Sequence, residues 1–180
     1  ATTWPEGTGF DATRKVQRNI IEGEAWPSGE IDEVSTRWIE FAVKPAKGTT
    51  LNVDSIGMYV CGCGGNGMRC KIYYSKDEDF GNAVNIADFS GSMKANDMMA
   101  VSAKPVLEVA ENETLRIRIY PWYNGAATGK TICISDVMIH GVAVDSTTGI
   151  NNLKTSNTSS RKSYYNINGV KTNSINKGLN

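Results

Sequence analysis

The residue types most suited to chemistry lie in one stretch of the chain, Arg116-Ile-Arg-Ile-Tyr-Pro-Trp-Tyr-Asn124. A sugar ring presents apolar C–H faces edged by hydroxyl groups, so its receptor needs flat aromatic rings beside hydrogen-bond donors and acceptors, as in the stacking of nucleobases. Pro121 is expected to end a strand or to confine it to a sheet edge, which places Trp122 and Tyr123 in the loop that follows. The stretch therefore predicts a sugar-binding surface with these two rings as platforms.

Basic and aromatic side chains alternate with apolar ones in this stretch and in the segment 68–75. If the two segments are strands of one sheet, their polar sides join into a basic, aromatic strip. Arginine binds carboxylates through paired hydrogen bonds, so such a strip favours a polymer that carries uronic acids. The predicted carbohydrate-binding residues are Trp122, Tyr123, Tyr120, Arg116, Arg118, Tyr73, Arg69, Lys71 and Asn124.

A purely structural interpretation of the same residues stays open. A tryptophan in a β-sandwich is more often part of the core than of a ligand platform, and alternating arginines usually form the solvated face of a strand. Trp38 is expected in packing or under a covered second face, and Trp4 and Trp26 are expected to anchor the N-terminal segment to the domain. An exposed Trp122 would favour binding, whereas a buried one would favour a spacer.

The sequence contains no convincing set of catalytic residues. The single histidine, His140, lies at the end of a predicted strand without a GxSxG nucleophile motif. Acids gather in turn-like segments such as 77–79, and a carboxylate pair for glycoside hydrolysis is recognised only by its separation in space. The glycines between 62 and 67 lack the Lys-Ser/Thr ending of a phosphate-binding loop, so a tight hairpin turn explains them better. We therefore expect no enzymatic activity.

Two isolated acids and four cysteines are the remaining candidate ligands. Glu40 and Asp136 are candidates for a calcium site, since sandwich domains hold Ca²⁺ with carboxylate and carbonyl oxygens; a surface or loop-capping role is the alternative. If the glycine-rich segment forms a hairpin, Cys61 and Cys70 face each other and a cross-strand disulfide becomes feasible. Small, buried free thiols are the alternative. These patterns require no cofactor.

The elements that must position these residues are β-strands. Short runs rich in Val, Ile, Thr and aromatic residues alternate with Gly, Asn, Asp and Pro, which is typical of an antiparallel all-β domain. Leu115, Ile117 and Ile119 share one face, opposite the arginines, as expected when one side of a sheet is buried. We predict an antiparallel β-sandwich of jelly-roll type. Its strands are expected near 37–44, 50–61, 68–75, 83–89, 98–109, 113–120, 130–135 and 137–144.

Composition divides the chain into four segments. Residues 1–36 are expected to be an irregular lead-in packed on the domain, with one short strand near 19–21, and residues 37–144 form the sandwich. Residues 145–162 are rich in Ser, Thr, Asn and Lys and are expected to be a polar linker. Residues 163–180 restart a strand-and-turn pattern that is expected to be a truncated tail module.

Charge and hydropathy argue against some classes of partner. The 180 residues carry 19 Lys and Arg against 19 Asp and Glu, so a general attraction to nucleic acid or to an anionic membrane is not supported. No apolar run approaches the roughly 20 residues that cross a bilayer, and no signal segment is present. We expect a monomer cut from a longer precursor, with neither nucleic acid nor membrane as partner.

The segment Leu115–Gly141, with Gly62-Cys-Gly-Gly-Asn-Gly-Met-Arg69, resembles ancillary domains of secreted plant-cell-wall-degrading enzymes from Bacteroidetes-type bacteria. These enzymes are chiefly pectate lyases and also xylan-active enzymes. The resemblance covers about residues 37–144 and rests mainly on Arg118-Ile-Tyr-Pro-Trp-Tyr-Asn124. The tail, Tyr164-Tyr-Asn-Ile-Asn-Gly-Val-Lys171 and Lys177-Gly-Leu-Asn180, resembles the start of a C-terminal module common on exported proteins of those bacteria.

The resemblance implies a secreted or cell-surface, non-catalytic carbohydrate-binding module that was joined to a catalytic domain in the same precursor. Its expected ligand is a plant cell-wall polysaccharide, with pectic polyuronate (homogalacturonan) first and xylan second. The alternative is a structural spacer that orients the catalytic domain and binds no sugar.

Overall fold

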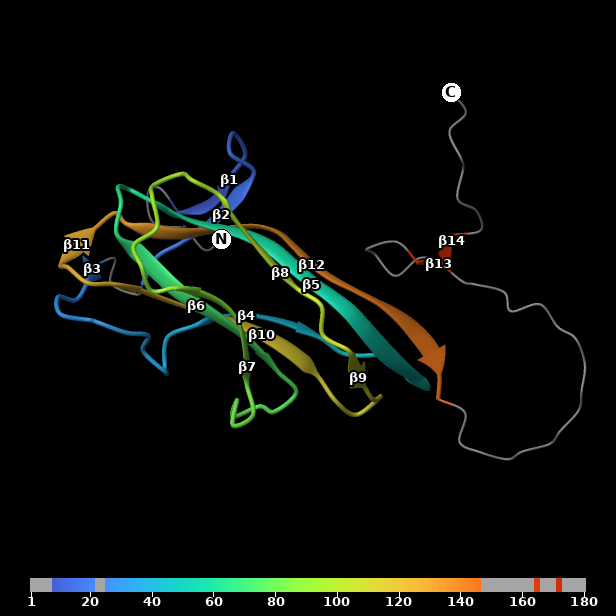
Figure 1. Ribbon diagram of the computed structural model, residues 1–180. Helices are drawn as coiled ribbons and strands as arrows, with labels where there is room; N and C mark the ends of the chain where they lie inside the picture. Colours follow the sequence, from blue (N-terminus) through green and yellow to red (C-terminus); the bar gives the residue numbers. More distant parts are fainter. Residues whose placement is uncertain (1–7, 22–24, 147–163, 166–170, 173–180) are drawn as a thin grey trace, which may run out of the picture. The chain divides into compact units, whose positions relative to one another are not determined.

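The structure is a computed structural model that describes residues 8–21, 25–146, 164–165 and 171–172 (Figure 1). The described residues form antiparallel strands, turns and loops, and none of them lies in a helix. The chain divides into two compact units, Ala1–Thr147 and Thr148–Asn180. The strands are β1 (Gly9–Asp11), β2 (Val16–Asn19), β3 (Ala25–Trp26), β4 (Ile39–Val43), β5 (Thr49–Cys63), β6 (Met68–Ser75), β7 (Val84–Phe89), β8 (Met99–Ala103), β9 (Leu107–Val109), β10 (Leu115–Tyr123), β11 (Ala127–Thr128), β12 (Thr131–Asp145), β13 (Tyr164–Tyr165) and β14 (Lys171–Thr172).

Two open antiparallel sheets make up most of the first unit. The larger sheet has the strand order β1-β2-β12-β5-β8, with β9 also paired to β5, and the smaller sheet has the order β4-β10-β6-β7. Figure 1 shows the two sheets as layers, one above the other. Strands β3 and β11 form a short ladder of their own. The prediction of an all-β chain with antiparallel sheets is confirmed.

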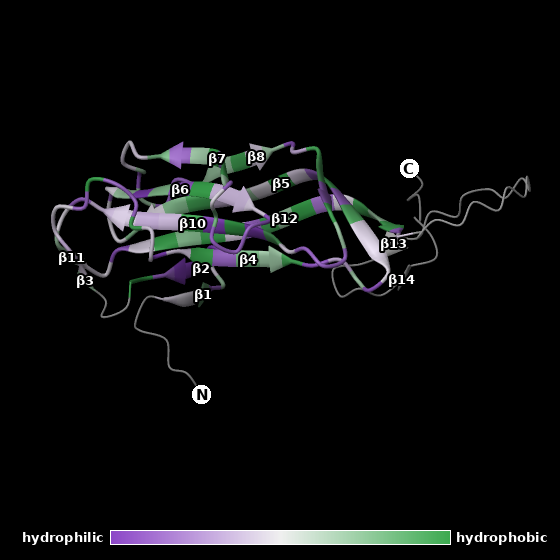
Figure 2. Ribbon diagram, turned by 90° about the horizontal axis from the view of Figure 1, so that it is seen from below, coloured by the Kyte–Doolittle hydropathy of each residue, from purple (hydrophilic) through white to green (hydrophobic). Residues whose placement is uncertain are grey.

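One shared core lies between the two sheets. Leu115, Ile117 and Ile119 of β10 are fully buried and belong to one cluster with Val60 of β5 and Ile132 of β12. Each such side chain contributes roughly 1.5–3 kcal/mol to folding through its transfer from water. The alternation of apolar and polar residues along the strands follows from this burial and is visible as bands of hydropathy along β4 and β7 (Figure 2). The predicted faces of the strand at 113–120 are confirmed.

The glycine-rich segment does not close a hairpin, contrary to the prediction. Strand β5 pairs with β12, β8 and β9, whereas β6 pairs with β10 and β7, so the chain crosses from one sheet to the other at Gly64–Gly67. A Cβ atom on Gly64, whose φ is +78°, would overlap the carbonyl oxygen of Gly129. Glycine is therefore required here by a close approach between two backbones. A disulfide between Cys61 and Cys70 is absent, and both thiols are free.

Pro121 does not end its strand, which was one of the two roles predicted for it; the other, a position at a sheet edge, agrees with the structure. Strand β10 continues to Tyr123, and Pro121 is the register partner of Cys70 in β6. On its other side β10 pairs with β4 only as far as Ile119. Among the described residues no strand pairs with β10 on the β4 side beyond that point, and an edge of this kind tolerates a proline.

The N-terminal segment contributes strands to the sandwich. Strand β2 pairs with β12 through residues such as Asn19 opposite Ile132, and β1 pairs with β2 at the sheet edge. The expected single short strand at 19–21 is replaced by β1, β2 and β3. The two strands expected at 130–135 and 137–144 are one strand, β12, with a register shift at Asp136, whose φ is +49°.

The C-terminal unit is described only at four residues, where β13 pairs with β14. Most of the predicted linker, from 147 onward, lies outside the described residues, as do the other tail positions. The described part of the chain holds no helix with the length and apolarity needed to cross a membrane.

Candidate functional site

The residues of the predicted strip do lie on one face. Strands β10 and β6 are neighbours in the smaller sheet, and their register sets Arg118 opposite Tyr73 and Tyr120 opposite Lys71. Because directly paired residues of antiparallel strands point to the same side, the polar faces of the two strands are continuous. We call this face, on the side of the sheet away from the core, the basic strip; its members are Arg116, Arg118, Tyr120, Arg69, Lys71 and Tyr73.

The arginines of the basic strip are neutralised by Glu40 of β4. Arg116 Nη1 lies 2.6 Å from one carboxylate oxygen of Glu40, and Arg118 Nε lies 2.7 Å from the other. Burial alone raises the pKa of Glu40, but the hydrogen bonds from Arg118 and Arg116 outweigh it and hold that pKa below its ordinary value. The Arg118 guanidinium also lies over the rings of Trp38 and Phe80, 4.2 Å and 3.8 Å from their centroids. These two arginines are therefore engaged within the protein.

Lys71 and Tyr73 of the basic strip are covered by the segment between β3 and β4. Lys71 Nζ lies 2.7 Å from Asp32 and 3.8 Å from Glu33, and the hydrogen bond to Asp32 raises the pKa of Lys71. The Tyr73 hydroxyl donates to Glu33 at 3.0 Å. Burial, followed by this hydrogen bond, raises the pKa of Tyr73 to about 12. The acids of a segment that was predicted to be irregular thus balance the charge of the sheet.

Trp122 is not a ligand platform. Its side chain is fully buried within β10, and its indole N–H has no hydrogen-bond partner among the described residues. Lys71 Nζ lies 5.8 Å from the centroid of its ring. Tyr120 is also buried, and it meets Tyr73 edge to face with ring centroids 5.7 Å apart. The prediction that Trp122 stands in an exposed loop is wrong, because the strand runs through Pro121.

Three of the predicted residues remain accessible at the other end of the strip. Arg69 donates to the carbonyl oxygens of Ser90 and Gly67, and no carboxylate within the described residues forms an ion pair with it. Tyr123 is half-buried with Lys130 Nζ 4.7 Å from its ring centroid. Asn124 is exposed in the turn that follows. We call Arg69, Tyr123 and Asn124 the rim; it contains no tryptophan and so no flat, exposed indole ring.

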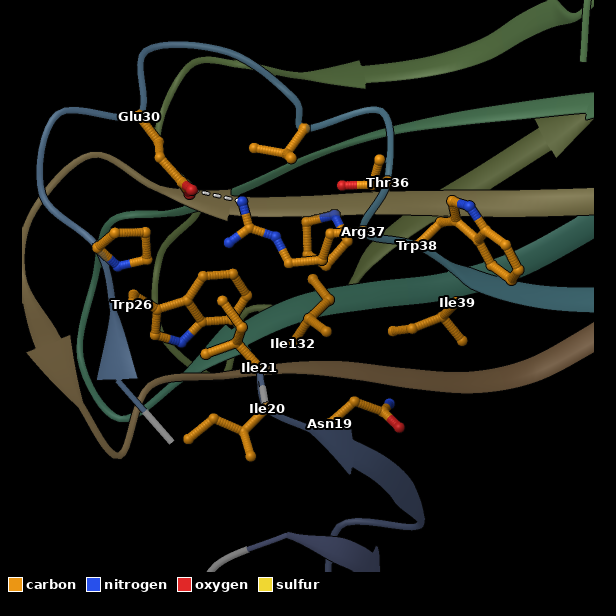
Figure 3. A pocket seen from close by; sticks show the side chains of 13 residues that line it. Asn19, Ile20, Ile21, Trp26, Glu30, Thr36, Arg37, Trp38, Ile39 and Ile132 are labelled. Carbon is orange, nitrogen blue, oxygen red and sulfur yellow. Dashed lines mark hydrogen bonds and ion pairs between the residues drawn. The ribbon is translucent and has the colours of Figure 1, made fainter. Parts of the chain in front are cut away.

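A cavity of about 550 Å³ lies where the N-terminal strands meet the smaller sheet (Figure 3). We call it the Trp26 cavity. Its walls combine two indole rings with aliphatic side chains, and an ion pair provides charged groups. The lining residues are Asn19, Ile20, Ile21, Trp26, Pro27, Glu30, Val34, Thr36, Arg37, Trp38, Ile39, Pro121 and Ile132.

Trp26 is the fixed wall of this cavity. Its indole N–H donates to the carbonyl oxygen of Lys130 at 2.8 Å, which joins β3 to the start of β12. The ring is almost fully buried, and the Arg37 guanidinium carbon lies 5.3 Å from its centroid. Figure 3 shows the Arg37 side chain above the Trp26 ring, with Ile21 beside it. This arrangement holds the guanidinium in a defined position.

Arg37 and Glu30 leave polar atoms unused in the wall of the cavity. The two side chains form an ion pair through Arg37 Nη2 and Glu30 Oε1. Arg37 Nε and Glu30 Oε2 are buried, and neither has a hydrogen-bond partner within the described part of the chain. An unsatisfied buried donor or acceptor costs about 1–3 kcal/mol, more for charged groups. Within the described residues, the ion pair therefore leaves one donor and one acceptor unused beside the cavity.

Trp38 supplies an accessible ring. Its side chain is 42% exposed, the most exposed indole among the described residues, and it lines the Trp26 cavity beside Ile39. The sequence interpretation assigned Trp38 and Trp26 to packing. The signal that could have drawn attention to them is the dipeptide Arg37-Trp38 after the acidic segment 30–33, which pairs a guanidinium with an indole just before a strand.

The other candidate ligands are not brought together. Both oxygens of Glu40 accept hydrogen bonds from arginines, while Asp136 lies at the bulge of β12 and accepts from Ser135 at 3.2 Å. Within the described residues these two acids belong to no group of three or more candidate metal ligands. His140 Nδ1 lies 2.6 Å from Asp54, with both side chains exposed.

The cysteines pair differently from the expectation. A disulfide joins Cys63 of β5 to Cys133 of β12, across 70 residues of sequence. Cys61 and Cys70 are buried and free.

Comparisons with models of protein families, with curated proteins and with solved structures gave no match for this chain.

Proposed function

We propose that this chain is a non-catalytic carbohydrate-binding domain that holds a neutral plant cell-wall polysaccharide at the Trp26 cavity. The observation that carries the proposal is the coincidence of an exposed indole, Trp38, with two polar atoms that have no partner within the described residues, Arg37 Nε and Glu30 Oε2. The cavity volume of about 550 Å³ falls in the range of about 300–1,000 Å³ that is usual for small-molecule sites. That volume accommodates one or two sugar rings.

The chemistry of a sugar ring matches both features of the wall. Its C–H face stacks on an indole, and its neighbouring hydroxyl groups each donate and accept hydrogen bonds. Once the two side chains rotate so that these buried atoms face the cavity, one hydroxyl donates to Glu30 Oε2 while the next accepts from Arg37 Nε. Hydrogen bonds to charged groups are worth about 1.5–3 kcal/mol each, so these two contacts orient the ring as well as bind it.

The charge of the site favours a neutral sugar over a uronic acid. Arg37 is already paired with Glu30, and a ligand carboxylate would approach the Glu30 carboxylate as well as the guanidinium. In the basic strip, Arg116, Arg118 and Lys71 are balanced in the same way. We therefore place xylan first and pectic polyuronate second, the reverse of the order expected from the sequence. A polyuronate would instead need the rim around Arg69.

The second candidate function is a structural spacer with no sugar site. It is favoured by the burial of Trp122 and by the cover that Asp32 and Glu33 place over the basic strip. A spacer would use these contacts for rigidity alone. A spacer offers no reason for the polar atoms of Glu30 and Arg37 that lack a partner within the described residues.

The wider setting is also proposed. The resemblance in the sequence supports a secreted domain, joined to a catalytic domain in its precursor and acting as a monomer.

The strand order supports a jelly-roll topology. Eight strands, numbered one to eight along the chain, make up the two facing sheets: β2, β4, β5, β6, β7, β8, β10 and β12. In these numbers the larger sheet has the order 1-8-3-6 and the smaller sheet the order 2-7-4-5, as in a sandwich built from two Greek keys.

Affinity gel electrophoresis of the full chain with xylan, polygalacturonate and cellulose tests the proposal. We expect xylan to retard the protein, and Trp38→Ala to abolish the retardation. Tyr59→Ala is the matched control, because Tyr59 is 44% exposed and lies outside the cavity lining. Retardation by polygalacturonate alone, lost in Arg69→Ala, would move the site to the rim. Retardation by none of the three would leave the spacer.

A further inference from the structure

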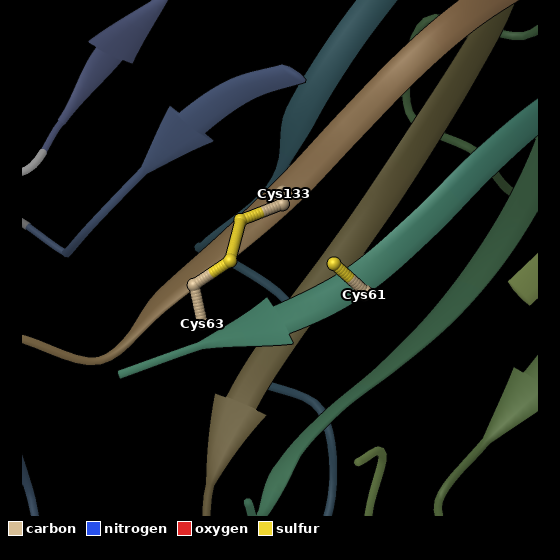
Figure 4. A group of neighbouring side chains, drawn as sticks. All are labelled: Cys61, Cys63 and Cys133. Atoms are coloured by element: carbon tan, nitrogen blue, oxygen red, sulfur yellow. A yellow bond between two sulfur atoms is a disulfide. The ribbon is translucent and has the colours of Figure 1, made fainter. Parts of the chain in front are cut away.

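Three cysteines converge on the outer face of the larger sheet. Cys61 and Cys63 are two residues apart on β5 and therefore point to the same side of the strand. Cys133 of β12 is the direct register partner of Cys61, and Thr131 is that of Cys63. Figure 4 shows the three sulfur atoms side by side between the two strands. All three sulfurs lie within 4.8 Å of one another.

These cysteines form a second, small core of their own. They are buried together with Val16 of β2, and the thioether side chain of Met98 packs against the group. The disulfide between Cys63 and Cys133 uses two of the three sulfurs and leaves Cys61 as a thiol beside it. Burial is the main cause that raises the pKa of the Cys61 thiol. Cys61 lies beside this disulfide but takes no part in it.

We propose that Cys61, Cys63 and Cys133 form a binding site for one Cu⁺ ion when the Cys63–Cys133 disulfide is reduced. The reduction consumes a two-electron reductant: with a phosphine and one water molecule, the S–S bond is cleaved, two thiols form and the phosphine becomes its oxide. Cu⁺ then binds the sulfurs as thiolates, and the displaced thiol protons are released to the solvent. This site is independent of sugar binding at the Trp26 cavity.

The spacing of the sulfurs suits a single small ion. A metal–sulfur distance of about 2.3 Å, as in zinc thiolates, places the three sulfurs of a trigonal site about 4 Å apart. The sulfurs already lie within 4.8 Å of one another, on two strands that are hydrogen-bonded neighbours. Coordination therefore needs only small side-chain rotations once the disulfide is open.

The kind of ligand selects the kind of ion. Thiolates and thioethers are soft donors, and soft donors favour Cu⁺. Zinc accepts thiolates too, but its usual protein ligands are Cys, His, Asp and Glu rather than Met. The candidate group contains only cysteines, Met98 is its neighbour, and His140 is engaged with Asp54. This all-sulfur set favours Cu⁺ over Zn²⁺.

The test uses the full chain, reduced without oxygen by a phosphine that is then removed. Cu⁺ is supplied as its complex with a coloured chelator, and the loss of colour counts the ions transferred. We expect one Cu⁺ per chain, and an affinity at least a hundredfold lower in Cys61→Ala. Cys61→Ala keeps both cysteines of the disulfide, and near-ultraviolet circular dichroism verifies that the variant is folded.

Cys70→Ala is the matched control, because Cys70 is equally buried but belongs to the core between the sheets. This variant is expected to bind Cu⁺ like the unchanged chain. The proposal is overturned if no Cu⁺ is transferred, if folded Cys61→Ala retains the ion, or if Cys70→Ala loses it equally. Displacement of bound Cu⁺ by equimolar Zn²⁺ would also overturn it.

Discussion

At the scale of single residues, the Glu40 carboxylate determines the charge of the basic strip. It accepts hydrogen bonds from Arg116 and Arg118, and the Arg118 side chain is almost fully buried between aromatic rings. Removing one partner of a buried ion pair leaves the other charge uncompensated. We therefore predict that Glu40→Gln lowers the free energy of unfolding by about 3 kcal/mol, measured by urea denaturation at neutral pH. Glu108→Gln, at an exposed position, should change it by less than about 0.5 kcal/mol.

The same carboxylate gives a prediction for pH. The folded-state pKa of Glu40 is lower than its ordinary value of 4.5, so its contribution to stability is present above that value and is lost as the pH falls through the lowered pKa. Below about pH 4.5, the unchanged chain should therefore lose stability more steeply than Glu40→Gln. Parallel unfolding profiles of the two proteins between pH 5 and 3 would contradict this role for Glu40.

Trp122 gives a prediction that separates packing from binding. Because its ring is fully buried, Trp122→Ala should lower the free energy of unfolding by about 3–5 kcal/mol through the loss of buried surface and the cavity left behind. Trp122→Phe retains most of the ring and removes an indole N–H that has no partner within the described residues, so its cost should be clearly smaller. Neither variant should weaken xylan binding while it is folded. Loss of binding in a folded Trp122→Phe would restore this ring as part of the site.

At the scale of elements, the crossing from β5 to β6 depends on backbone contact. The turn at Gly64 lies so close to Gly129 that a methyl group would overlap its carbonyl oxygen, and the positive φ adds strain. We predict that Gly64→Ala lowers the free energy of unfolding by about 2–3 kcal/mol. Gly91→Ala is the matched control, since nothing lies within 4 Å of its added Cβ atom. Chemical denaturation of both variants measures the difference, and equal stability would contradict the close approach.

These elements also show what sequence patterns can and cannot predict. The alternation of Leu115, Ile117 and Ile119 with arginines predicted the buried face correctly, because alternation depends only on the local geometry of a strand. The continuation of β10 through Pro121 depends on where β4 ends, which is a matter of pairing between distant segments. The same holds for Gly64–Gly67, which resembles a hairpin locally but joins two sheets.

The same limit applies to the candidate site: contacts between segments that are distant in sequence could not be predicted. The sequence left open whether β10 and β6 are neighbours, and the structure shows that they are; the acids that cover Lys71 and Tyr73 were not predicted. Asp32 and Glu33 reach Lys71 and Tyr73 from about 40 residues away in sequence. No local pattern encodes such a contact, so the sequence left the burial of Trp122 open and did not predict the exposure of Trp38.

At the scale of the whole molecule, the N-terminal segment converts a plain sandwich into one with a cavity. Strands β1 and β2 extend the larger sheet, while the segment after β3 lies over the outer face of the smaller sheet. The Trp26 cavity is lined by both parts of this segment and by Pro121 and Ile132 of the two sheets. Sugar recognition, as proposed, is thus a property of the assembled fold rather than of one stretch of sequence.

The most direct measurement is the response of the indole N–H signals to xylo-oligosaccharide in ¹H–¹⁵N spectra of the full chain. Each tryptophan gives one such signal, and Trp→Phe variants assign them. We predict that the signals of Trp38 and Trp26 shift in a saturable manner while that of Trp122 stays in place. A shift confined to Trp122, or no shift of any indole with xylan, polygalacturonate or cellulose fragments, would contradict sugar binding at the Trp26 cavity.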